Sequence, residues 1–417
     1  MYDINEKDCL QVLSSYFNSD HFELIEFHGN GSSEASLGLL GNNSSVWCKV
    51  RINKKIKEVN FFVKTLPLND FHRECVNISG CFLKETIFYN QIRSGMKKYL
   101  CNKVIPEFYY SNSEKIILED LCVAGYKNSN LNGYFDLQHC LSSLKSLAEF
   151  HASSLLYERD LGLNLDKNFP DITFYSWISD IEDHPGQKHI LTGISAIKRI
   201  LDQYFTHHPI CTRQKVIEIL LKVPVQLKPS KSYRNCLSHV DLWCNNIMFK
   251  YNEEFKVEDA VLIDFQLFGY NPPSLDFLML IYLNTAKTTR EKHFTHFISH
   301  YYTHFCNVLQ NFNIDPVSVL KKKDLVSSMS ETLETTLSLT ILYLHYVLIP
   351  VEDLLPIVKD VEKFKYFLWI DRSDLILSTI TKDEVYKEKL FNAINDLINH
   401  VIKLDSSAEF PHDVNII

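Results

Sequence analysis

Two aspartates and an asparagine lie around the two ends of an apolar stretch that has the pattern of one β-hairpin. Its halves read "NIMFKY" and "DAVLIDF", and the polar segment "NEEFKVE" joins them. If the halves pair as antiparallel strands, Asn246 lies opposite Asp264, with Cβ atoms roughly 5 Å apart. A carboxylate and an amide oxygen so placed suit Mg²⁺, which takes few protein oxygens and completes its shell with water and phosphate. The hairpin therefore predicts a magnesium site.

A further carboxylate precedes the hairpin. Asp241 lies five residues before Asn246, on the loop that enters the first strand. At this spacing a carboxylate stays beside the metal without binding it, and it can orient a hydroxyl group and accept its proton. The three side chains together predict a phosphoryl-transfer site. The alternative is that Asp241 and Asn246 only cap a turn and a strand, since both residue types commonly bond local backbone groups.

The elements that must position these groups divide the sequence into two parts. From about residue 22 to 121 apolar residues mostly alternate, as in "VWCKVRI" and "VNFFVK", which predicts antiparallel strands. Within this part "SGCFLKETIFYNQIRSG" predicts one helix, bounded by Gly80 and Gly95, and "KIILEDL" predicts a further strand. We therefore expect an α+β protein with two lobes, of which the smaller, residues 1–122, holds an antiparallel sheet and one main helix.

The remainder, residues 123–417, has the longer spacing of helices and predicts a larger, mainly helical lobe. The segment "QHCLSSLKSLAEFHASSLL" carries an apolar stripe at spacings of three and four residues, and His151 within it is expected to be a hydrogen-bonded core residue. The longest weakly charged apolar run, residues 337–350, is too short to span a bilayer and predicts a buried helix.

Composition narrows the possible classes of protein. A chain of 417 residues with 46% hydrophobic residues can bury two cores. The net charge is −8 and basic residues are scattered, which argues against nucleic acid as a partner. The start "MYDINEKDCL" lacks the pattern of a signal peptide, and eleven cysteines without a CxxC favour free thiols. We expect a cytoplasmic protein without a membrane span, and nothing in the sequence requires a protein partner.

The order of these motifs resembles a known superfamily. His239-x-Asp241-Leu242-x-x-x-Asn246, followed by Asp264-Phe265, resembles the protein-kinase-like proteins. The segments "HVDLWCNNIMFKY" and "LIDFQL" are most similar to the ecdysteroid-kinase-like small-molecule kinases of animals, relatives of choline kinases and aminoglycoside phosphotransferases. The resemblance covers nearly the whole chain and includes, in the family's order, "FVKTLP", "FLKETIFY", "LEDL", "LAEFHASS" and "PPSLDFL". It implies a protein-kinase-like fold that uses ATP and Mg²⁺.

The same resemblance assigns roles to residues outside the hairpin. Lys64 is expected to be the strand lysine that binds the α- and β-phosphates of ATP, with Glu85 as its helix partner. Glu119 and Leu121 are expected to form the adenine hinge through backbone groups. Asp276 is expected to brace the catalytic loop, and the alternative is that it caps the helix that follows.

A glycine-containing turn is expected to cover the phosphates. The family's order places it at "GNNSS", with Gly41, Asn42, Ser44 and Ser45 as binding residues. Backbone N–H groups can approach an anion closely there because glycine leaves room. The similar "GNGSS" at Gly29 competes for this role.

The spacing after the hairpin indicates the kind of acceptor. Asp276 follows Asp264 by only twelve positions and no Ala-Pro-Glu follows, so the activation segment that seats a peptide in protein kinases has no room. The acceptor is therefore expected to be a hydroxyl group of a small molecule. Trp243, Phe268 and Tyr270 are close in sequence and could hold a sterol-like skeleton or a cationic amine. The resemblance favours an ecdysteroid-like sterol, with choline or ethanolamine as the alternative.

A second hypothesis is a protein that binds a nucleotide or a sterol with weak or no catalysis. Val240 follows His239, where the small-molecule branch usually carries glycine, and the chain has no complete GxGxxG. The complete set of lysine, glutamate, two aspartates and asparagine favours an enzyme, because binding alone has little need for all five.

Overall fold

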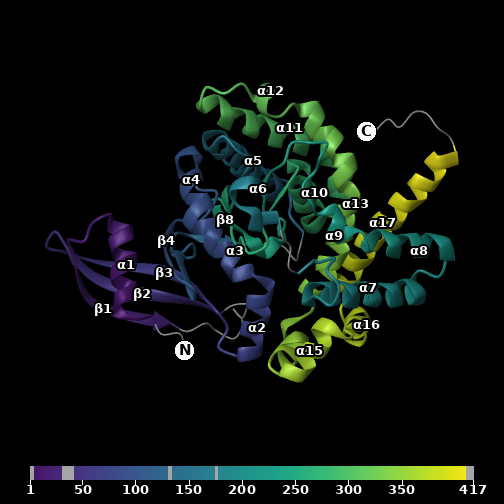
Figure 1. The fold of residues 1–417 in the computed structure, drawn as a ribbon, viewed down its shortest axis with the longest axis horizontal. Coiled ribbons are helices and arrows are strands. Elements are labelled where there is room, and N and C mark those ends of the chain that lie inside the picture. The colour runs from purple at the N-terminus through teal and green to yellow at the C-terminus, as the bar shows by residue number, and fades with distance from the viewer. Residues whose placement is uncertain (1–3, 31–41, 130–133, 174–176, 410–417) are drawn as a thin grey trace.

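The alternating segments form one antiparallel sheet in a small N-terminal lobe (Figure 1). The computed structural model describes residues 4–30, 42–129, 134–173 and 177–409. Within them the sheet has the strand order β1-β2-β3-β5-β4. Its strands are β1 (Glu23–Asn30), β2 (Asn42–Ile52), β3 (Lys55–Thr65), β4 (Phe108–Ser111) and β5 (Lys115–Glu119).

One face of this sheet packs against helix α1 (Glu6–Phe17), which the sequence patterns did not predict. Alternate residues of β2 and β3, such as Cys48 and Phe61, are fully buried there against Val12 and Leu13 of the helix. The helix begins with a capping box, because the side chain of Asn5 accepts a hydrogen bond from the backbone of Asp8 and the reciprocal bond is also present.

The other face holds the main helix, which begins after Gly80 as predicted but continues past the predicted end at Gly95. Gly80, at φ +63°, ends α2 (Asp70–Ser79) and starts a helical segment of α3 (Cys81–Ile87), η2 (Phe88–Arg93), α4 (Ser94–Met96) and η3 (Lys97–Tyr99). The predicted stop at Gly95 is wrong, because the helix continues through it. A Cβ atom on Gly95 would lie 2.2 Å from the ring of Tyr157, so the glycine serves close helix packing.

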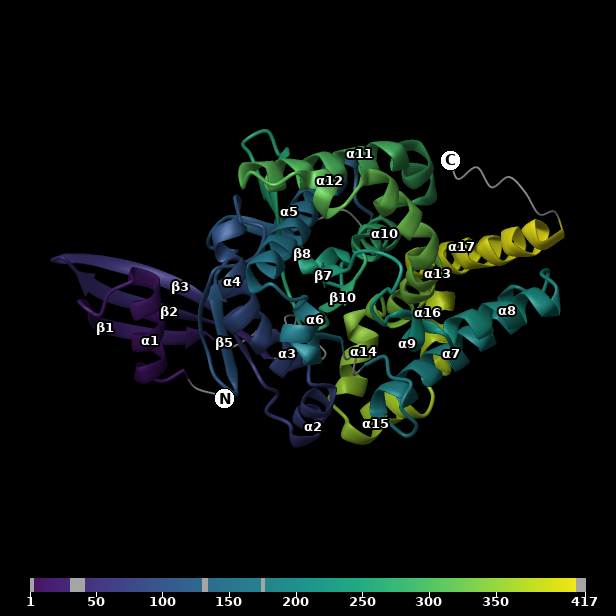
Figure 2. The same ribbon diagram turned by 45° about the horizontal axis from the view of Figure 1, so that its top comes forward.

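The C-terminal lobe is mainly helical, which confirms the predicted fold class (Figure 2). Helix α11 lies along α5, and α13 packs against α10 and α17. The helices of this lobe are α5 (Leu137–Leu161), α6 (Leu165–Asn168), η4 (Pro170–Thr173), α7 (Pro185–Tyr204), α8 (Ile210–Leu220), α9 (Val223–Gln226), η5 (Cys244–Asn246), α10 (Pro273–Asn284), α11 (Lys287–Asn311), α12 (Pro316–Val319), α13 (Lys322–Val347), α14 (Val351–Val358), α15 (Val361–Trp369), α16 (Ser373–Lys382) and α17 (Glu384–Glu409).

Short strands at the inner end of this lobe carry the predicted hairpin. Strands β8 (Ile247–Tyr251) and β9 (Val257–Leu262) pair antiparallel, and β6 (Tyr126–Asn128) joins them as an outer strand. A second small sheet consists of β7 (Cys236–Ser238) and β10 (Gly269–Asn271).

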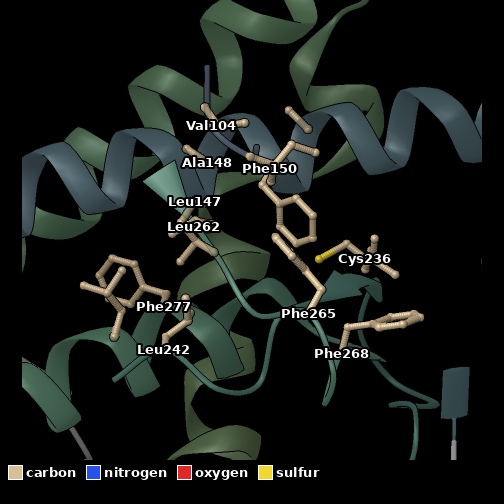
Figure 3. Close-up of a cluster of buried hydrophobic side chains, with 14 of the residues drawn as sticks. Val104, Leu147, Ala148, Phe150, Cys236, Leu242, Leu262, Phe265, Phe268 and Phe277 are labelled. Atoms are coloured by element: carbon tan, nitrogen blue, oxygen red, sulfur yellow. The ribbon is translucent and has the colours of Figure 1, made fainter. Parts of the chain in front are cut away.

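The hairpin rests on a continuous apolar core that also reaches the N-terminal lobe. Figure 3 shows Phe150 of α5 beside Phe265 and Leu262, the residues at the end of the hairpin. The ring of Phe265 also stacks on Phe88 of the main helix, with ring centroids 3.9 Å apart. Because one aromatic ring touches elements of both lobes, the residues next to it in sequence are held in a fixed position between the lobes.

Three further predictions concern the apolar run at residues 337–350, a membrane span and the cysteines. The apolar run at residues 337–350 falls mostly in the buried part of α13, as predicted. Among the described residues no single helix has the length and apolarity to cross a membrane, while one pair, Pro316–Val347 with Val351–Val358, passes that test only when taken together across an 80° bend. All eleven cysteines are free thiols.

Candidate active site

The sheet positions Lys64 on the face that holds the main helix. Lys64 pairs with Ile116 of β5 in the strand register, and its side chain reaches the start of that helix. Its ammonium group donates hydrogen bonds to a carboxylate oxygen of Glu85, 2.6 Å away, and to one of Asp264, 2.8 Å away. The structure therefore joins a strand, a helix and the distant hairpin through one buried cation.

Two carboxylates share this single ammonium group. Burial acts to lower the pKa of Lys64, but the charges of Asp264 and Glu85 outweigh it and raise the pKa above its usual value. Burial, opposed by Lys64 and reinforced by the charge of Asp264, raises the pKa of Glu85 to about 7. The lysine is therefore charged at neutral pH, and the excess negative charge lies toward the hairpin.

The hairpin forms as predicted, but its register differs by one residue. Ile247 pairs with Leu262, and the N–H of Ile263 donates to the carbonyl oxygen of Asn246 at 3.0 Å. Asn246 thus faces Ile263, where the prediction placed Asp264. Strand β9 ends at Leu262, and Asp264 has φ +67°, a left-handed conformation that turns its carboxylate out of the strand and toward Lys64.

Asp241 lies beside these residues in the same cavity. Its side chain is 6% exposed, and its carbonyl oxygen accepts a hydrogen bond from the side-chain amide of Asn246 at 2.9 Å. Burial, followed by the charge of Asp264, raises the pKa of the Asp241 carboxyl to about 8. This group is thus poised to hold or release a proton near neutral pH.

Asp276 holds the loop that carries Asp241. Its two carboxylate oxygens accept hydrogen bonds from the N–H groups of His239 and Val240, at 2.5 and 2.9 Å. The imidazole of His151 contacts one of these oxygens at 3.1 Å and the hydroxyl group of Tyr301 at 2.7 Å. The geometry fits the expected bracing role, whereas the alternative of a helix cap is wrong because Pro272 occupies the cap position of α10.

Val240 is the residue of this loop with a strained backbone. Its φ is +65°, a region that a β-branched side chain rarely adopts, and its side chain is 1% exposed. The hydroxyl group of Tyr343 donates to its carbonyl oxygen at 3.1 Å. Packing and hydrogen bonds therefore hold valine in the conformation that glycine would adopt at lower energy.

The groups described above open into one cavity of about 190 Å³ between the lobes. Lys64, Asp241, Asn246 and Asp264 line its charged end. Its other wall comes from α7, α13 and α15 and is largely apolar and aromatic, with residues such as Ile190, Leu342, Tyr346, Phe364 and Phe367. One cavity thus joins a charged site to an apolar one.

Two predicted contact residues lie elsewhere. Trp243 lines the cavity, but Phe268 and Tyr270 are buried in the core and do not. The hydroxyl group of Tyr270 donates to Glu158 at 2.6 Å, deep in the C-terminal lobe. Nearness in sequence to the hairpin therefore identified Trp243 correctly but misplaced the other two residues.

The predicted phosphate turn is also different in the structure. Asn42, Ser44 and Ser45 are part of strand β2, so a turn over this segment is wrong, and Gly41 lies outside the described residues. Strand alternation places Asn42 and Ser44, opposite Thr65 and Val63, on the face away from Lys64. The competing residue Gly29 is paired with Val46 in β1.

The residues expected to contact adenine lie at the end of β5 and just beyond it. The carboxylate of Glu119 forms an ion pair with Lys103, and the backbone N–H of Glu119 donates to the carbonyl oxygen of Glu107 at 2.9 Å. The carbonyl oxygen of Leu121 accepts from Tyr126 at 2.9 Å. Neither Glu119 nor Leu121 is among the residues that line the 190 Å³ cavity, and Glu119 is paired with Phe61, three positions before Lys64 on β3.

Asn43, Lys84 and Gln266 line the cavity and were missed by the sequence patterns. Asn43 pairs with Lys64 across β2 and β3, and its buried side-chain oxygen has no hydrogen-bond partner among the described residues. Lys84 donates to the carbonyl oxygen of Phe268 at 2.6 Å, and burial lowers its pKa to about 8. Strand alternation in "GNNSS" was the signal that could have singled out Asn43.

The donor set at the hairpin fits a hard divalent cation that retains other ligands. Asn246 uses its amide nitrogen within the protein, which leaves its amide oxygen for the cavity, and Asp264 adds a carboxylate. Over the part of the chain that the structure describes, no group of three or more His, Cys, Asp and Glu side chains could hold a metal. Two oxygens suit an ion such as Mg²⁺ that binds together with phosphates.

Comparison with known proteins gives one family match. The model of the ecdysteroid kinase-like family matches residues 42–314. No curated protein matches the chain in sequence.

The solved structures that match this chain are remote from it. The streptomycin–ATP–APH(2″)-IIa ternary complex has 15% identity and a TM-score of 0.38 over 94% of this chain and 99% of that chain. An ethanolamine kinase of Plasmodium vivax has 13% identity and a TM-score of 0.39, over 92% and 91% of the two chains. A microcompartment-associated aminopropanol kinase has 12% identity and a TM-score of 0.33, over 82% and 98%. At these scores the likenesses add nothing to the family match.

Proposed function

The chain belongs to the ecdysteroid kinase-like family, a family of small-molecule phosphotransferases with an alcohol group as acceptor, and we propose that it transfers the γ-phosphate of ATP to a hydroxyl group of an ecdysteroid-like sterol. The observation that carries the proposal is the contact of Lys64 with both Glu85 and Asp264, in a cavity that also contains Asp241. Groups from three distant parts of the sequence meet there as phosphoryl transfer requires.

Lys64 would bind the phosphates of ATP, and Glu85 would fix the ammonium group in place. Asn246 and Asp264 would hold Mg²⁺, which when bound supplies charge neutralisation on phosphate oxygens. The lysine already carries its charge and is oriented by two hydrogen bonds. Little reorganisation would then be needed when the nucleotide binds.

Asp241 would orient the acceptor hydroxyl and take its proton. The fixed backbone of its loop, held by Asp276, supports this role, because positioning is the larger part of catalysis in phosphoryl transfer. A cation bound at Asn246 and Asp264 would favour the ionised form of Asp241 and counter the effect of burial on its pKa.

The nucleotide would lie between two lobes with the boundary near residue 122. We assign residues 1–122 to the ATP-binding lobe and residues 123–417 to the lobe that binds the acceptor and carries Asp241. Backbone groups of Glu119 and Leu121 would contact adenine, and Gly41 and Ser45 would contribute to binding the phosphates. Of the residues predicted to bind the phosphates in "GNNSS", Ser45 lies on the same face of the sheet as Lys64. This position supports a contact between Ser45 and the phosphates.

The apolar wall of the cavity supports a sterol skeleton as the acceptor, since burial of apolar surface contributes roughly 25 cal/mol per Å². A weakly active or inactive binding protein is the second candidate. The strained backbone at Val240 is the observation that favours it, because the loop carrying Asp241 departs there from the glycine of related kinases.

The test is phosphate transfer from γ-labelled ATP to polyhydroxylated sterols, choline and ethanolamine by the full-length chain. Asp264→Ala is expected to abolish transfer, because it removes a metal ligand and one partner of Lys64. Glu258→Gln, an exposed substitution in the same hairpin, is the matched control and should leave transfer unchanged. Full transfer by Asp264→Ala, or binding of ATP without transfer by the wild type, would overturn the proposal.

A further inference from the structure

A buried arginine, Arg372, lies behind the apolar wall of the cavity. Arg372, at the start of α16, is 2% exposed, and no carboxylate of the described residues forms an ion pair with it. Its guanidinium group lies within 3.1 Å of Nδ1 of His189 and 3.5 Å of Nε2 of His345, and donates to the carbonyl oxygens of His189 and Leu368 at 2.7 and 3.3 Å. Hydrogen bonds and the rings of Phe367 and Tyr346, 5.2 and 5.9 Å away, partly offset the cost of burying a cation without a carboxylate partner, but its retention still calls for a reason.

Burial and the neighbouring arginine together keep both histidines neutral. Burial, followed by the charge of Arg372, holds the pKa of His189 well below its usual range and lowers that of His345 to about 3. Both rings are therefore neutral and carry one N–H each. Because Nδ1 of His189 faces a guanidinium donor, it must accept, and the proton lies on Nε2.

This arrangement leaves a donor on the cavity wall. His189 lines the cavity and is half-buried. Within the described residues its Nδ1 contacts the guanidinium group, and its Nε2 makes no hydrogen bond. The ring is held edge-on between Trp177 and Tyr346, with centroids 5.1 and 5.6 Å away. The orientation of the N–H group is thus set by packing as well as by Arg372.

The other residues of the cavity wall determine which ligand could bind to the Nε2–H of His189. Of the described residues that line the cavity, Asp241 and Asp264 alone carry a carboxylate, and both lie at the phosphoryl end. Lys64 and Lys84 add positive charge to the cavity, as does Arg372 from behind it. Beside His189 a cationic amine would find no carboxylate and would lie near the charge of Arg372, whereas a neutral oxygen would find a hydrogen-bond donor.

We propose that Arg372 and His189 form an acceptor-orienting pair, in which the Nε2–H of His189 donates to a second oxygen of a neutral, largely apolar alcohol. The proposal rests on the proposed function and deepens it. While that oxygen is bound, the hydroxyl group that receives the phosphate is held toward Asp241 at the other end of the cavity. His189 is a positioning residue, and Arg372 acts through it.

The experiment measures binding and turnover of a polyhydroxylated sterol and of the matching sterol with a single hydroxyl group. His189→Phe keeps the ring but removes the donor, and His189→Gln restores an N–H close to the Nε2 position. The wild type is expected to bind the polyhydroxylated sterol roughly 2- to 12-fold more tightly, as for one neutral hydrogen bond. His189→Phe should remove this preference and raise KM with little change in kcat, and His189→Gln should restore it.

Calorimetry of sterol binding to the Asp264→Ala variant separates this proposal from the proposed function, because it needs no turnover. The preference for the polyhydroxylated sterol should persist there and disappear when His189→Phe is added. Lys198→Gln, on the exposed side of α7, is the matched control and should have no effect. Unchanged preference in His189→Phe, preferred phosphorylation of choline or ethanolamine, or no sterol binding by the wild type would each overturn the pair. Sterol binding with the expected preference but no transfer by the wild type would overturn the proposed function alone.

Discussion

The sheet of the N-terminal lobe holds two buried lysines on its two faces, and they differ in what surrounds them. Lys115 faces α1 and forms an ion pair with Asp8 at 2.5 Å, with both residues about 5% exposed or less. Lys64 faces the main helix and bonds Glu85 at 2.6 Å. Thr65 is paired with Lys115 and Lys64 with Ile116, so the two lysines belong to neighbouring rows of the same ladder.

The difference lies in charge balance and in access. Lys64 has a second carboxylate partner, Asp264, that comes from the other lobe, and it lines a cavity. Lys115 does not line that cavity, and its partner Asp8 is part of a helix cap. Burial and pairing alone therefore do not identify a functional lysine. An additional carboxylate from a distant segment, placed at a cavity, distinguishes the pair that we propose for the active site from the structural one.

Breaking the structural pair should have the largest effect on stability. Lys115→Met leaves the carboxylate of Asp8 buried without its cation, so the free energy of unfolding should fall by about 3–5 kcal/mol. Transfer by the folded fraction should be unchanged. Chemical denaturation measures the first effect and initial rates measure the second. Adding Asp8→Leu should recover part of the stability, and a loss of catalysis in the folded double variant would contradict the distinction between the two faces.

Breaking the other pair should affect catalysis most. Lys64→Met is expected to lower kcat/KM by about 10²–10³, the usual effect of removing one preorganised donor at a phosphoryl or oxyanion site. Stability should fall less than in Lys115→Met, because Glu85, with a pKa of about 7, can take up a proton when the cation is lost. Initial rates and denaturation of both variants side by side test this. Equal losses of stability in the two would show that the faces do not differ.

The smallest expected effect is on the pH dependence of the transfer rate, which the Asp241 carboxyl group should determine. Asp241 must be ionised to accept a proton, and its pKa is about 8 without a bound cation. The rate should therefore fall as pH decreases through the pKa of this group, by tenfold per unit well below it. Bound metal favours the ionised form, so the midpoint of kcat/KM at saturating ATP and Mg²⁺ should lie below 8. A midpoint that does not move with the Mg²⁺ concentration would contradict this assignment.

The parts of the site that follow from local sequence were predictable. The hairpin, the strand that carries Lys64 and the helix that carries Glu85 all show in periodicity and motif order, because each needs only short-range patterns. The hairpin register was missed by one residue, since the positive φ of Asp264 is a property of the folded loop. The phosphate turn was misplaced because β2 begins at Asn42, before any strand pattern is visible.

The acceptor wall could not be predicted in the same way. His189, His345 and Arg372 lie on three helices that are distant in sequence, and none of them belongs to a spaced motif. The role of these residues depends on tertiary contacts, which bring a cation and two neutral rings together behind an apolar surface. Similarly, the partner of Lys115 lies 107 residues away in a helix that periodicity did not reveal. Side chains that interact only through packing leave no regular signal in the sequence.

The hydrogen bonds of Asp276 link helix α11 to the loop that carries Asp241, through Tyr301 and His151. Every group in this chain of contacts is fully or almost fully buried, so none can be replaced by solvent. A genetic screen for inactive enzymes should thus recover substitutions at Tyr301, whose effects would resemble those of a damaged catalytic loop although its ring never meets a ligand.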